Sequence, residues 1–279
     1  MNMTLKRAVS IPMTLLLLMG LFGCGGGSRE EKAEKRILEA MQEKYGKEFV
    51  LDSIGGSWGT MNNNTLKAVV RPADDDTLKV PVEITKDLKD VYDMYLNQAV
   101  ARNEQPKIET IAKQFWPDSK IVISNDTKLM YPEDNNTSMS YKEFLEKNPN
   151  NTMLIMLYLN GDQYVGDKGT IDEEKELKNQ LAFANQIAEQ GYVSTRVSFV
   201  YAKPEMYNRF EEALQSSETV DRYFEKEQEK TGESFDLTRT TFKVDKDGKI
   251  VETEEKIKSY FELWKEEREE YASQRGGAR

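Results

Sequence analysis

The chain has a single cysteine, Cys24, and no histidine among its 279 residues. One cysteine cannot form an internal disulfide, so stability must come from ordinary hydrophobic cores. The lack of histidine excludes Ser-His-Asp and Cys-His catalysis, histidine-bearing zinc sites and the commonest general base at neutral pH. Gly-rich phosphate loops and Ser-x-x-Lys pairs are also missing from the sequence. We therefore expect no catalytic residue, no cofactor and no metal site.

Basic residues are outnumbered by acidic ones, 39 against 49, which gives a formal charge of −10. Nucleic acids and anionic lipid headgroups should both repel such a surface, so we expect no nucleic-acid partner. Hydrophobic residues make up 38% of the chain and charged residues 32%. This composition is typical of a globular, highly solvated protein rather than a disordered one.

The first 24 residues have the layout of a secretory signal. Lys6 and Arg7 precede an apolar run over residues 8–22, and Gly23 and Cys24 follow it. A basic start, a short apolar segment and a small residue at its end are the parts of a cleavable signal peptide. The apolar run is shorter than a comfortable membrane span.

Leu21-Phe22-Gly23-Cys24 resembles the lipobox of bacterial lipoproteins. The resemblance implies a diacylglyceryl group, with palmitate-type chains, on the Cys24 sulfur and cleavage just before that residue. Cleavage removes two basic residues and no acidic one, so the formal charge falls from −10 to −12. The resemblance places the protein on the extracytoplasmic face of the cell membrane, attached through the lipid on Cys24. The alternatives are an ordinary secretory signal with a free cysteine and a single-span anchor.

The start of the body resembles small uncharacterised lipoproteins of Gram-positive bacteria. The resemblance rests on a helix, the stretch Lys44-Tyr45-Gly46-Lys47-Glu48-Phe49 and a following strand. It favours the outer face of a Gram-positive membrane and implies no site residue.

The pattern of apolar residues predicts an α+β fold made of two small modules, each with a mixed or antiparallel sheet packed by amphipathic helices. A polar stretch with proline and paired asparagines separates the modules. The predicted divisions are a signal peptide at 1–23, a Gly-rich tether at 24–28, a first module at 29–125, a linker at 126–139 and a second module at 140–275.

Within the first module we expect the order α-β-β-β-α-α-β, with a capping box at Ser28 and Glu31 opening the first helix and Gly46 ending it. The third strand ends near Ile84, a helix carries the apolar residues from Leu88 to Ala99, Pro106 starts another helix, and residues 121–123 form the last strand. In the second module, residues 153–159 read as a strand buried on both faces, and Thr170 as the cap of a long helix. We expect a strand over 192–201, a hairpin from Phe235 to Val251 and one final helix over about 253–273.

One internal similarity links the two modules. Residues 43–51 and 229–237 both read as a helix closed by glycine and followed by a strand with Phe and Leu. Two copies of one module would explain it, but helix–glycine–strand punctuation recurs by chance, and the flanking order differs.

Trp58 is the candidate binding residue, because it stands among glycines in Gly55-Gly56-Ser57-Trp58-Gly59. An exposed indole there could stack on a ligand or partner. A hairpin turn with the indole folded onto the core is the simpler interpretation, and the one we favour.

The acidic runs point to turns more than to metal sites. Asp74-Asp75-Asp76 could offer oxygen ligands to calcium, but three adjacent aspartates cannot all point inward. Asp245-Lys246-Asp247-Gly248 resembles part of an EF-hand loop and fits better as an Asp-Gly hairpin turn.

Taken together, these features predict a lipid-anchored protein of the cell envelope that acts by binding, with an envelope protein or peptide as its partner. Two other classes stay open at this point. One is a cell-wall hydrolase using two carboxylates, which sequence alone cannot pair. The other is a solute-binding lipoprotein, whose two-lobed fold needs more alternating strand–helix units than the chain offers.

Overall fold

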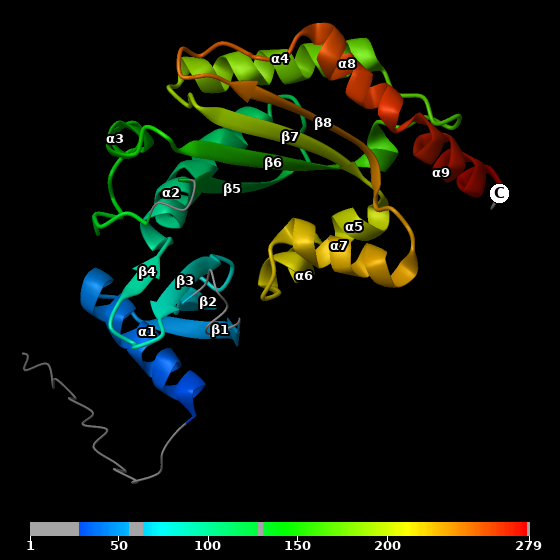
Figure 1. Ribbon diagram of the computed structural model, residues 1–279. Coiled ribbons are helices and arrows are strands. Elements are labelled where there is room, and N and C mark those ends of the chain that lie inside the picture. Colours follow the sequence, from blue (N-terminus) through cyan, green and yellow to red (C-terminus); the bar gives the residue numbers. More distant parts are fainter. Residues whose placement is uncertain (1–27, 56–63, 128–130, 278–279) are drawn as a thin grey trace, which may run out of the picture.

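The computed structural model describes residues 28–55, 64–127 and 131–277, and it has the predicted α+β architecture of two sheets packed by helices. Figure 1 shows the smaller N-terminal sheet with helix α1 beneath a larger sheet that carries the remaining helices. Each sheet has four strands, in the orders β1-β2-β3-β4 and β5-β6-β7-β8.

The first sheet is an antiparallel meander, in which each strand pairs with the next one along the chain. Alternating apolar residues of β2 and β3 point to one face, where they meet the apolar stripe of α1. Ile37 and Met41 of α1 are fully buried there. The elements are α1 (Arg29–Tyr45), β1 (Phe49–Gly55), β2 (Thr65–Pro72), β3 (Val80–Thr85) and β4 (Val91–Asp93).

Helix α1 starts and stops at the residues that the sequence predicts. The Ser28 hydroxyl accepts a hydrogen bond from the Glu31 amide, and the Glu31 carboxylate accepts one from the Ser28 amide. This capping box satisfies two amides that the first helical turn leaves unpaired. Gly46 closes the helix in the left-handed conformation, with φ of 66°.

Two predictions for residues 88–116 are wrong. The stretch expected as a helix from Leu88 holds strand β4, and the helix α2 (Tyr95–Ala112) begins after it. Pro106 does not start a new helix but lies inside α2. Apolar residues on both sides of Pro106 pack into the cores, and this packing outweighs the hydrogen bond that proline removes.

The second sheet is mixed. Strand β5 runs antiparallel to β6, β6 runs parallel to β7, and β7 runs antiparallel to β8. The parallel pair needs a crossover, which α4 provides. The strand predicted at residues 121–123 exists as β5, but it pairs with β6 and so belongs to this second sheet. The strands are β5 (Lys120–Asp126), β6 (Thr152–Asn160), β7 (Thr195–Ala202) and β8 (Asp236–Val244).

Helices cover both faces of the second sheet (Figure 1). Residues of α2, α4 and α8 form the main core with one face, and residues of α5, α6 and α7 form a second core with the other. This explains the continuous apolar run of β6, which is buried on both sides. The helices are α3 (Tyr141–Lys147), η1 (Gly161–Gln163), α4 (Glu173–Glu189), α5 (Pro204–Asn208), α6 (Phe210–Gln215), α7 (Val220–Thr231), α8 (Glu254–Leu263) and α9 (Lys265–Gly277).

Three details of the second module differ from expectation. The cap of α4 is Asp172, not Thr170. The hairpin after Asp247-Gly248 is reduced to one isolated bridge between Val244 and Ile250. The single helix expected at the end is two helices, α8 and α9, because the backbone leaves the helical region at Trp264.

Helix α2 joins the two sheets. Tyr95 and Ala99, near its start, pack into the core of the first sheet, whereas Val100 and Ile108 pack into that of the second. Arg102 of α2 donates to the Asp75 carboxylate in the turn between β2 and β3, with a distance of 2.9 Å from Nε. One rigid helix therefore holds both sheets.

Candidate functional site

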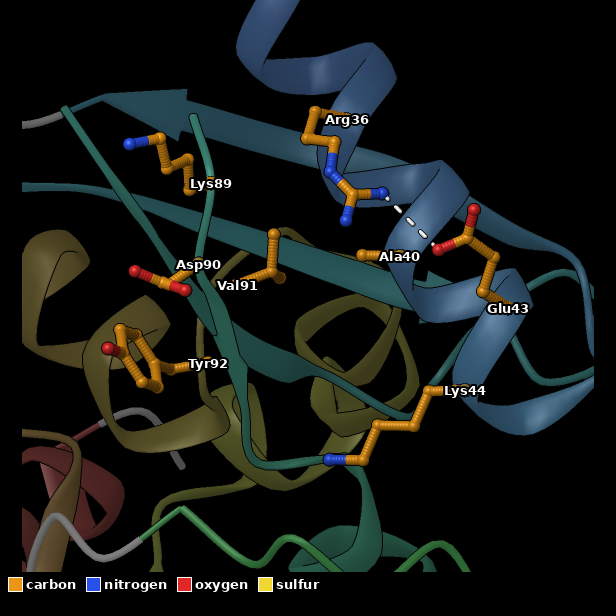
Figure 2. A pocket seen from close by; sticks show the side chains of 8 residues that line it. All are labelled: Arg36, Ala40, Glu43, Lys44, Lys89, Asp90, Val91 and Tyr92. Carbon is orange, nitrogen blue, oxygen red and sulfur yellow. Dashed lines mark hydrogen bonds and ion pairs between the residues drawn. The ribbon is translucent and has the colours of Figure 1, made fainter. Parts of the chain in front are cut away.

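An open groove of about 450 Å³ lies between α1 and β4 of the first sheet. We call it the α1–β4 groove. Figure 2 shows helix residues on one side of it and strand residues on the other. The small side chain of Ala40, between larger neighbours one helical turn away, leaves room at its floor. The lining residues are Arg36, Ala40, Glu43, Lys44, Lys89, Asp90, Val91 and Tyr92.

The sequence of α1 determines which of its residues line the groove. In α1 the buried positions Ala33, Ile37 and Met41 face the sheet, so the residues one position earlier lie beside that stripe, toward β4. The guanidinium of Arg29 donates to the Lys86 carbonyl at 2.6 Å, which fixes the start of α1 to the turn before β4. The helix therefore runs beside the short strand along its length.

One end of the groove is held by a buried carboxylate. Asp93 is 2% exposed and accepts hydrogen bonds from Lys44 Nζ at 2.8 Å and from the Tyr45 hydroxyl at 2.7 Å. Burial, and then the charge of Asp93, raises the pKa of Tyr45 far above its usual value, so this phenol stays a donor. Lys44 also donates to the Pro132 carbonyl at 3.0 Å. Pro132 of the expected linker segment therefore lies beside Lys44 at the Asp93 end of the groove.

Two tyrosines lie at the rim. Tyr92 is 41% exposed, and its ring centroid is 5.5 Å from that of Tyr131. Burial, with a hydrogen bond to the Glu83 carboxylate, raises the pKa of Tyr131 to about 12. The pair presents an aromatic surface beside the edge of the first sheet, and the raised pKa keeps the Tyr131 phenol a neutral donor at physiological pH.

A second hollow of about 370 Å³ lies between the end of α2 and helices α5 and α6. Lys120 lies over the rings of Tyr207 and Phe210, at 4.6 and 5.2 Å from their centroids, and donates to the Tyr207 carbonyl at 3.0 Å. The Lys120 ammonium group therefore already occupies the ring faces that could otherwise bind an external cation. Ser119 lines this hollow too, and its buried hydroxyl oxygen has no hydrogen-bond partner among the described residues.

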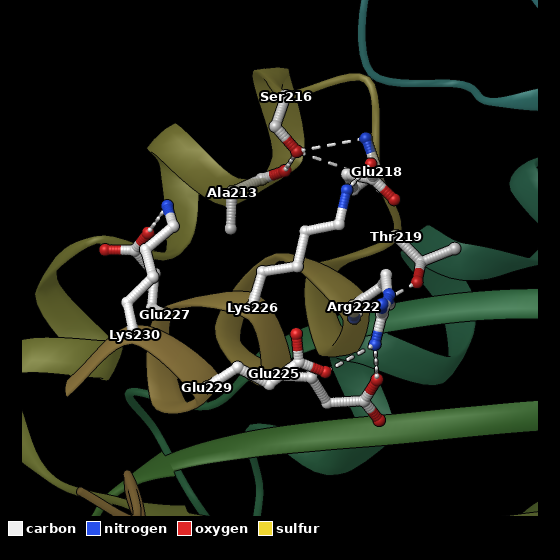
Figure 3. Close-up of polar contacts among 10 residues, drawn as sticks. All are labelled: Ala213, Ser216, Glu218, Thr219, Arg222, Glu225, Lys226, Glu227, Glu229 and Lys230. Atoms are coloured by element: carbon white, nitrogen blue, oxygen red, sulfur yellow. Dashed lines mark hydrogen bonds and ion pairs between the residues drawn. The ribbon is translucent and has the colours of Figure 1, made fainter. Parts of the chain in front are cut away.

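The charged surface of α6 and α7 is a solvated ion-pair network rather than a site. Figure 3 shows Arg222 between Glu225 and Glu229, at 3.1 and 3.2 Å. Lys230 pairs with Glu227 at 2.7 Å, and Lys226 pairs with Glu218. These side chains are largely exposed, so each pair contributes little to stability.

The acidic residues do not form a catalytic pair that the structure singles out. Glu173 has a carboxyl neighbour in Glu262: burial, followed by the charge of Glu262, raises the pKa of Glu173. Neither residue lines the two hollows described above. Across residues 28–55, 64–127 and 131–277, no group of three or more Asp, Glu, Cys or His side chains is placed to hold a metal ion.

A buried polar cluster supports the main core. The carboxylate of Glu176, 2% exposed, accepts hydrogen bonds from the Trp116 indole at 3.0 Å and the Tyr201 hydroxyl at 2.6 Å. Gln180 donates to the same hydroxyl at 3.0 Å and accepts from Thr240 at 3.0 Å. None of these residues lines either of the two hollows described above, so we assign the cluster a structural role.

The structure describes some of the residues singled out from the sequence and leaves others outside its described ranges. Cys24 and Trp58 lie outside the described residues. Asp75 is in a turn, as expected, and is paired with Arg102. Asp245 accepts from the amides of Asp247 and Lys249, which makes the expected Asp-Gly turn, with Gly248 at φ of 80°.

The residues of the α1–β4 groove were not found by sequence reasoning. Half-buried Arg36 and exposed Lys89 and Tyr92 carry no motif, and β4 is only three residues long. The one usable signal is Ala40, a small residue beside the apolar stripe of α1.

Comparisons with known proteins identify a shared fold. A DUF5037 family protein from Ruminococcus gnavus ATCC 29149, known as a crystal structure, superposes with a TM-score of 0.54 at 14% sequence identity. The alignment covers 82% of this chain and 98% of the other. No family model and no curated protein matches the sequence. The likeness therefore shows that both sheets and their helices form an arrangement that another bacterial protein also adopts.

Proposed function

We propose that the protein is anchored by lipid on Cys24 at the extracytoplasmic face of the cell membrane and binds an envelope protein or peptide there without catalysing a reaction. The observation that carries the proposal is the sequence Leu21-Phe22-Gly23-Cys24 at the end of a short apolar run, with the chain's sole cysteine at its last position. A thiol is the nucleophile needed for a stable thioether to the lipid. Two acyl chains give lasting attachment, at roughly 0.8 kcal/mol for each buried CH₂.

The start of the fold is compatible with cleavage before Cys24. The first described helix has its own capping box at Ser28, so it needs no residue from the signal segment. Removal of residues 1–23 takes away none of the described helices and strands. Among the described residues, no helix is long and apolar enough to cross a bilayer.

The tether would keep the body close to the membrane. Residues 24–28 are mostly glycine, and a flexible chain of about five residues spans on the order of 12 Å. The start of α1, and with it the open end of the α1–β4 groove, would therefore be near the lipid surface. A groove in this position can reach membrane-proximal segments of other envelope proteins.

Replacement of Cys24 tests the anchor. In the native host, the wild-type protein should be recovered with membranes and have an acylated Cys24 as its first residue in mass spectrometry. The Cys24→Ala variant should lose the lipid and keep its signal segment or appear in the soluble fraction. Ser28→Ala, which affects only the helix cap, should stay acylated and is the matched control. Recovery of native protein from the cytosol with Met1 and a free thiol would overturn the proposal.

A further inference from the structure

Strand β4 is an edge strand with an unpaired side. It pairs with β3 alone, in the register Val82↔Asp93, Glu83↔Tyr92 and Ile84↔Val91. An edge strand offers a row of amides and carbonyls that another extended chain can pair with. Native proteins usually cover or shorten such an edge, and here the strand has three residues.

The register shows which backbone groups face outward. The Thr85 amide donates to the Asp90 carbonyl and the Met94 amide to the Pro81 carbonyl, both at 3.0 Å. Residues 90, 92 and 94 therefore point their backbone groups toward β3, and those of Val91 and Asp93 point away from it. Within the described part of the chain, the amide and carbonyl of Val91 have no hydrogen-bond partner.

The space beyond this edge is the α1–β4 groove. Val91 lines it together with Ala40 on the helix opposite, and the groove has a volume of about 450 Å³ (Figure 2). A helix beside a free strand edge is the arrangement into which an extended peptide adds as a further strand. Side chains of such a strand alternate, so every second one points toward α1. Ala40 and Val91 leave an apolar place for a small side chain there.

The charge of the groove indicates what the neighbouring inward side chain should be. Arg36 points into the space between helix and strand (Figure 2). Among the described residues its ion pair is a 3.4 Å contact with Glu43, whose side chain is 71% exposed and free to swing away. Lys44, by contrast, is already paired with buried Asp93 at 2.8 Å. Lys89, also in the lining, pairs with Asp87 at 3.2 Å. Arg36 is therefore a cation that a carboxylate entering the groove can pair with.

We propose that the α1–β4 groove binds an extended acidic segment of another envelope protein by strand addition to β4. The Val91 amide and carbonyl pair with the backbone of the segment. One inward carboxylate meets Arg36, and the inward side chain two positions away, small and apolar, lies against Ala40. This inference rests on the proposed binding function and on no property of the lipid anchor.

A random peptide library tests the proposal. Phage-displayed peptides of about 12 residues, long enough to add a strand, are selected against the immobilised mature chain. Selected sequences should carry Asp or Glu two positions from Ala or Val, and synthetic copies should bind the mature chain in solution. If no peptide is enriched over a blank support, or if the enriched ones are basic, the proposal is wrong.

Variants locate the binding. Ala40→Leu fills the floor of the groove and Arg36→Glu reverses its cation, so each should weaken binding of the selected peptide by about tenfold or more. Gln42→Leu, on an exposed face of the same helix, should leave the affinity unchanged. Equal affinity for all four proteins would place the peptide elsewhere. Thermal melts of each variant show that the fold is retained.

Amide hydrogen exchange tests the strand addition itself. With the selected peptide bound, exchange at Val91 should slow by about tenfold or more, while that of exposed amides in α7 should not change. Tight binding without protection at Val91 would overturn strand addition. Self-association that Ala40→Leu abolishes would instead assign the groove to a second copy of the chain. The peptide measurements need no lipid, so they can fail while Cys24 proves acylated, and the reverse is also possible.

Discussion

At the scale of single residues, the most consequential buried group is Glu176. It forms no ion pair with any residue that the structure describes, and it accepts hydrogen bonds from the Trp116 indole and the Tyr201 hydroxyl. Burial, and then the charge of Glu176, raises the pKa of Tyr201 well above its usual value, so the phenol donates across the physiological range.

Removal of this carboxylate should be costly. Glu176→Ala leaves two buried donors unpaired at about 1–3 kcal/mol each and opens a cavity, so we expect a loss of about 3–5 kcal/mol in the free energy of unfolding. Glu176→Gln keeps the shape and one acceptor and should lose less. The matched control is Glu174→Ala, whose side chain is 78% exposed and which should cost below about 1 kcal/mol. Urea denaturation measures all three, and a similar cost for Glu176→Ala and Glu174→Ala would contradict the structural role.

The Glu173–Glu262 pair predicts a pH dependence of stability. The folded pKa of Glu173 is above its ordinary 4.5, through burial first and then the charge of Glu262, with Arg268 and Lys258 opposing. A raised folded pKa stabilises the protein below the unfolded pKa, and this contribution is lost as pH rises through the folded pKa.

Glu173→Gln should therefore stabilise the protein near pH 7, by less than about 1 kcal/mol because the site is largely solvated. At pH values below the ordinary pKa of a glutamate the gain should vanish, because Glu173 is then protonated in both the folded and the unfolded state. Thermal melts over pH 3–8 measure it. Glu262→Gln should give a similar gain, and the double variant should fall short of the sum because the two groups couple. A gain that stays constant over this pH range would refute the pairing.

At the scale of elements, the glycines that close α1 and α7 behave alike. Gly46 and Gly232 both adopt positive φ, at 66° and 74°. The strands that follow them, β1 and β8, are edge strands of different sheets. The similarity of residues 43–51 and 229–237 therefore agrees with a common local pattern rather than with two copies of one module. Each glycine ends its helix in the left-handed conformation, although the surrounding elements differ.

Gly46→Ala should measure how much the free energy of unfolding depends on the left-handed backbone conformation at Gly46. An added Cβ meets no atom within 4 Å, so the cost is the strain of a left-handed alanine, about 1 kcal/mol. Gly55→Ala is the control, because Gly55 is equally open but has no positive φ. Urea midpoints should fall for the first variant and stay level or rise for the second. Equal midpoints would show that α1 can end without the left-handed turn.

The whole molecule depends on α2, which contributes to the cores of both sheets. Its start packs on the first sheet and its middle on the second, and Arg102 ties it to the turn between β2 and β3. The two sheets are therefore joined by a packed helix as well as by the polar segment expected as a linker. Lys44 contacts that segment at Pro132, which adds a further tie between α1 and the rest of the molecule.

Local elements with strong periodicity or clear ends could be predicted from the sequence. The α+β class, the capping box at Ser28, the buried strand β6 and the Asp-Gly turn at Gly248 all follow from patterns within a few residues. Such features depend on hydrogen bonds and side-chain spacing that neighbouring residues fix without help from the rest of the fold.

The pairing of the elements and the position of the groove depend on contacts between distant parts of the chain and could not be predicted. Residues 121–123 could be predicted as a strand, but their partner β6 lies beyond the linker. Pro106 stays inside α2 because packing into two distant cores outweighs a lost hydrogen bond. The α1–β4 groove joins residues 36–44 to residues 89–92, which meet only when the meander of the first sheet brings its last strand beside the first helix. Contacts between segments far apart in the chain leave no local signature, and this is why the candidate binding residues emerged from the fold.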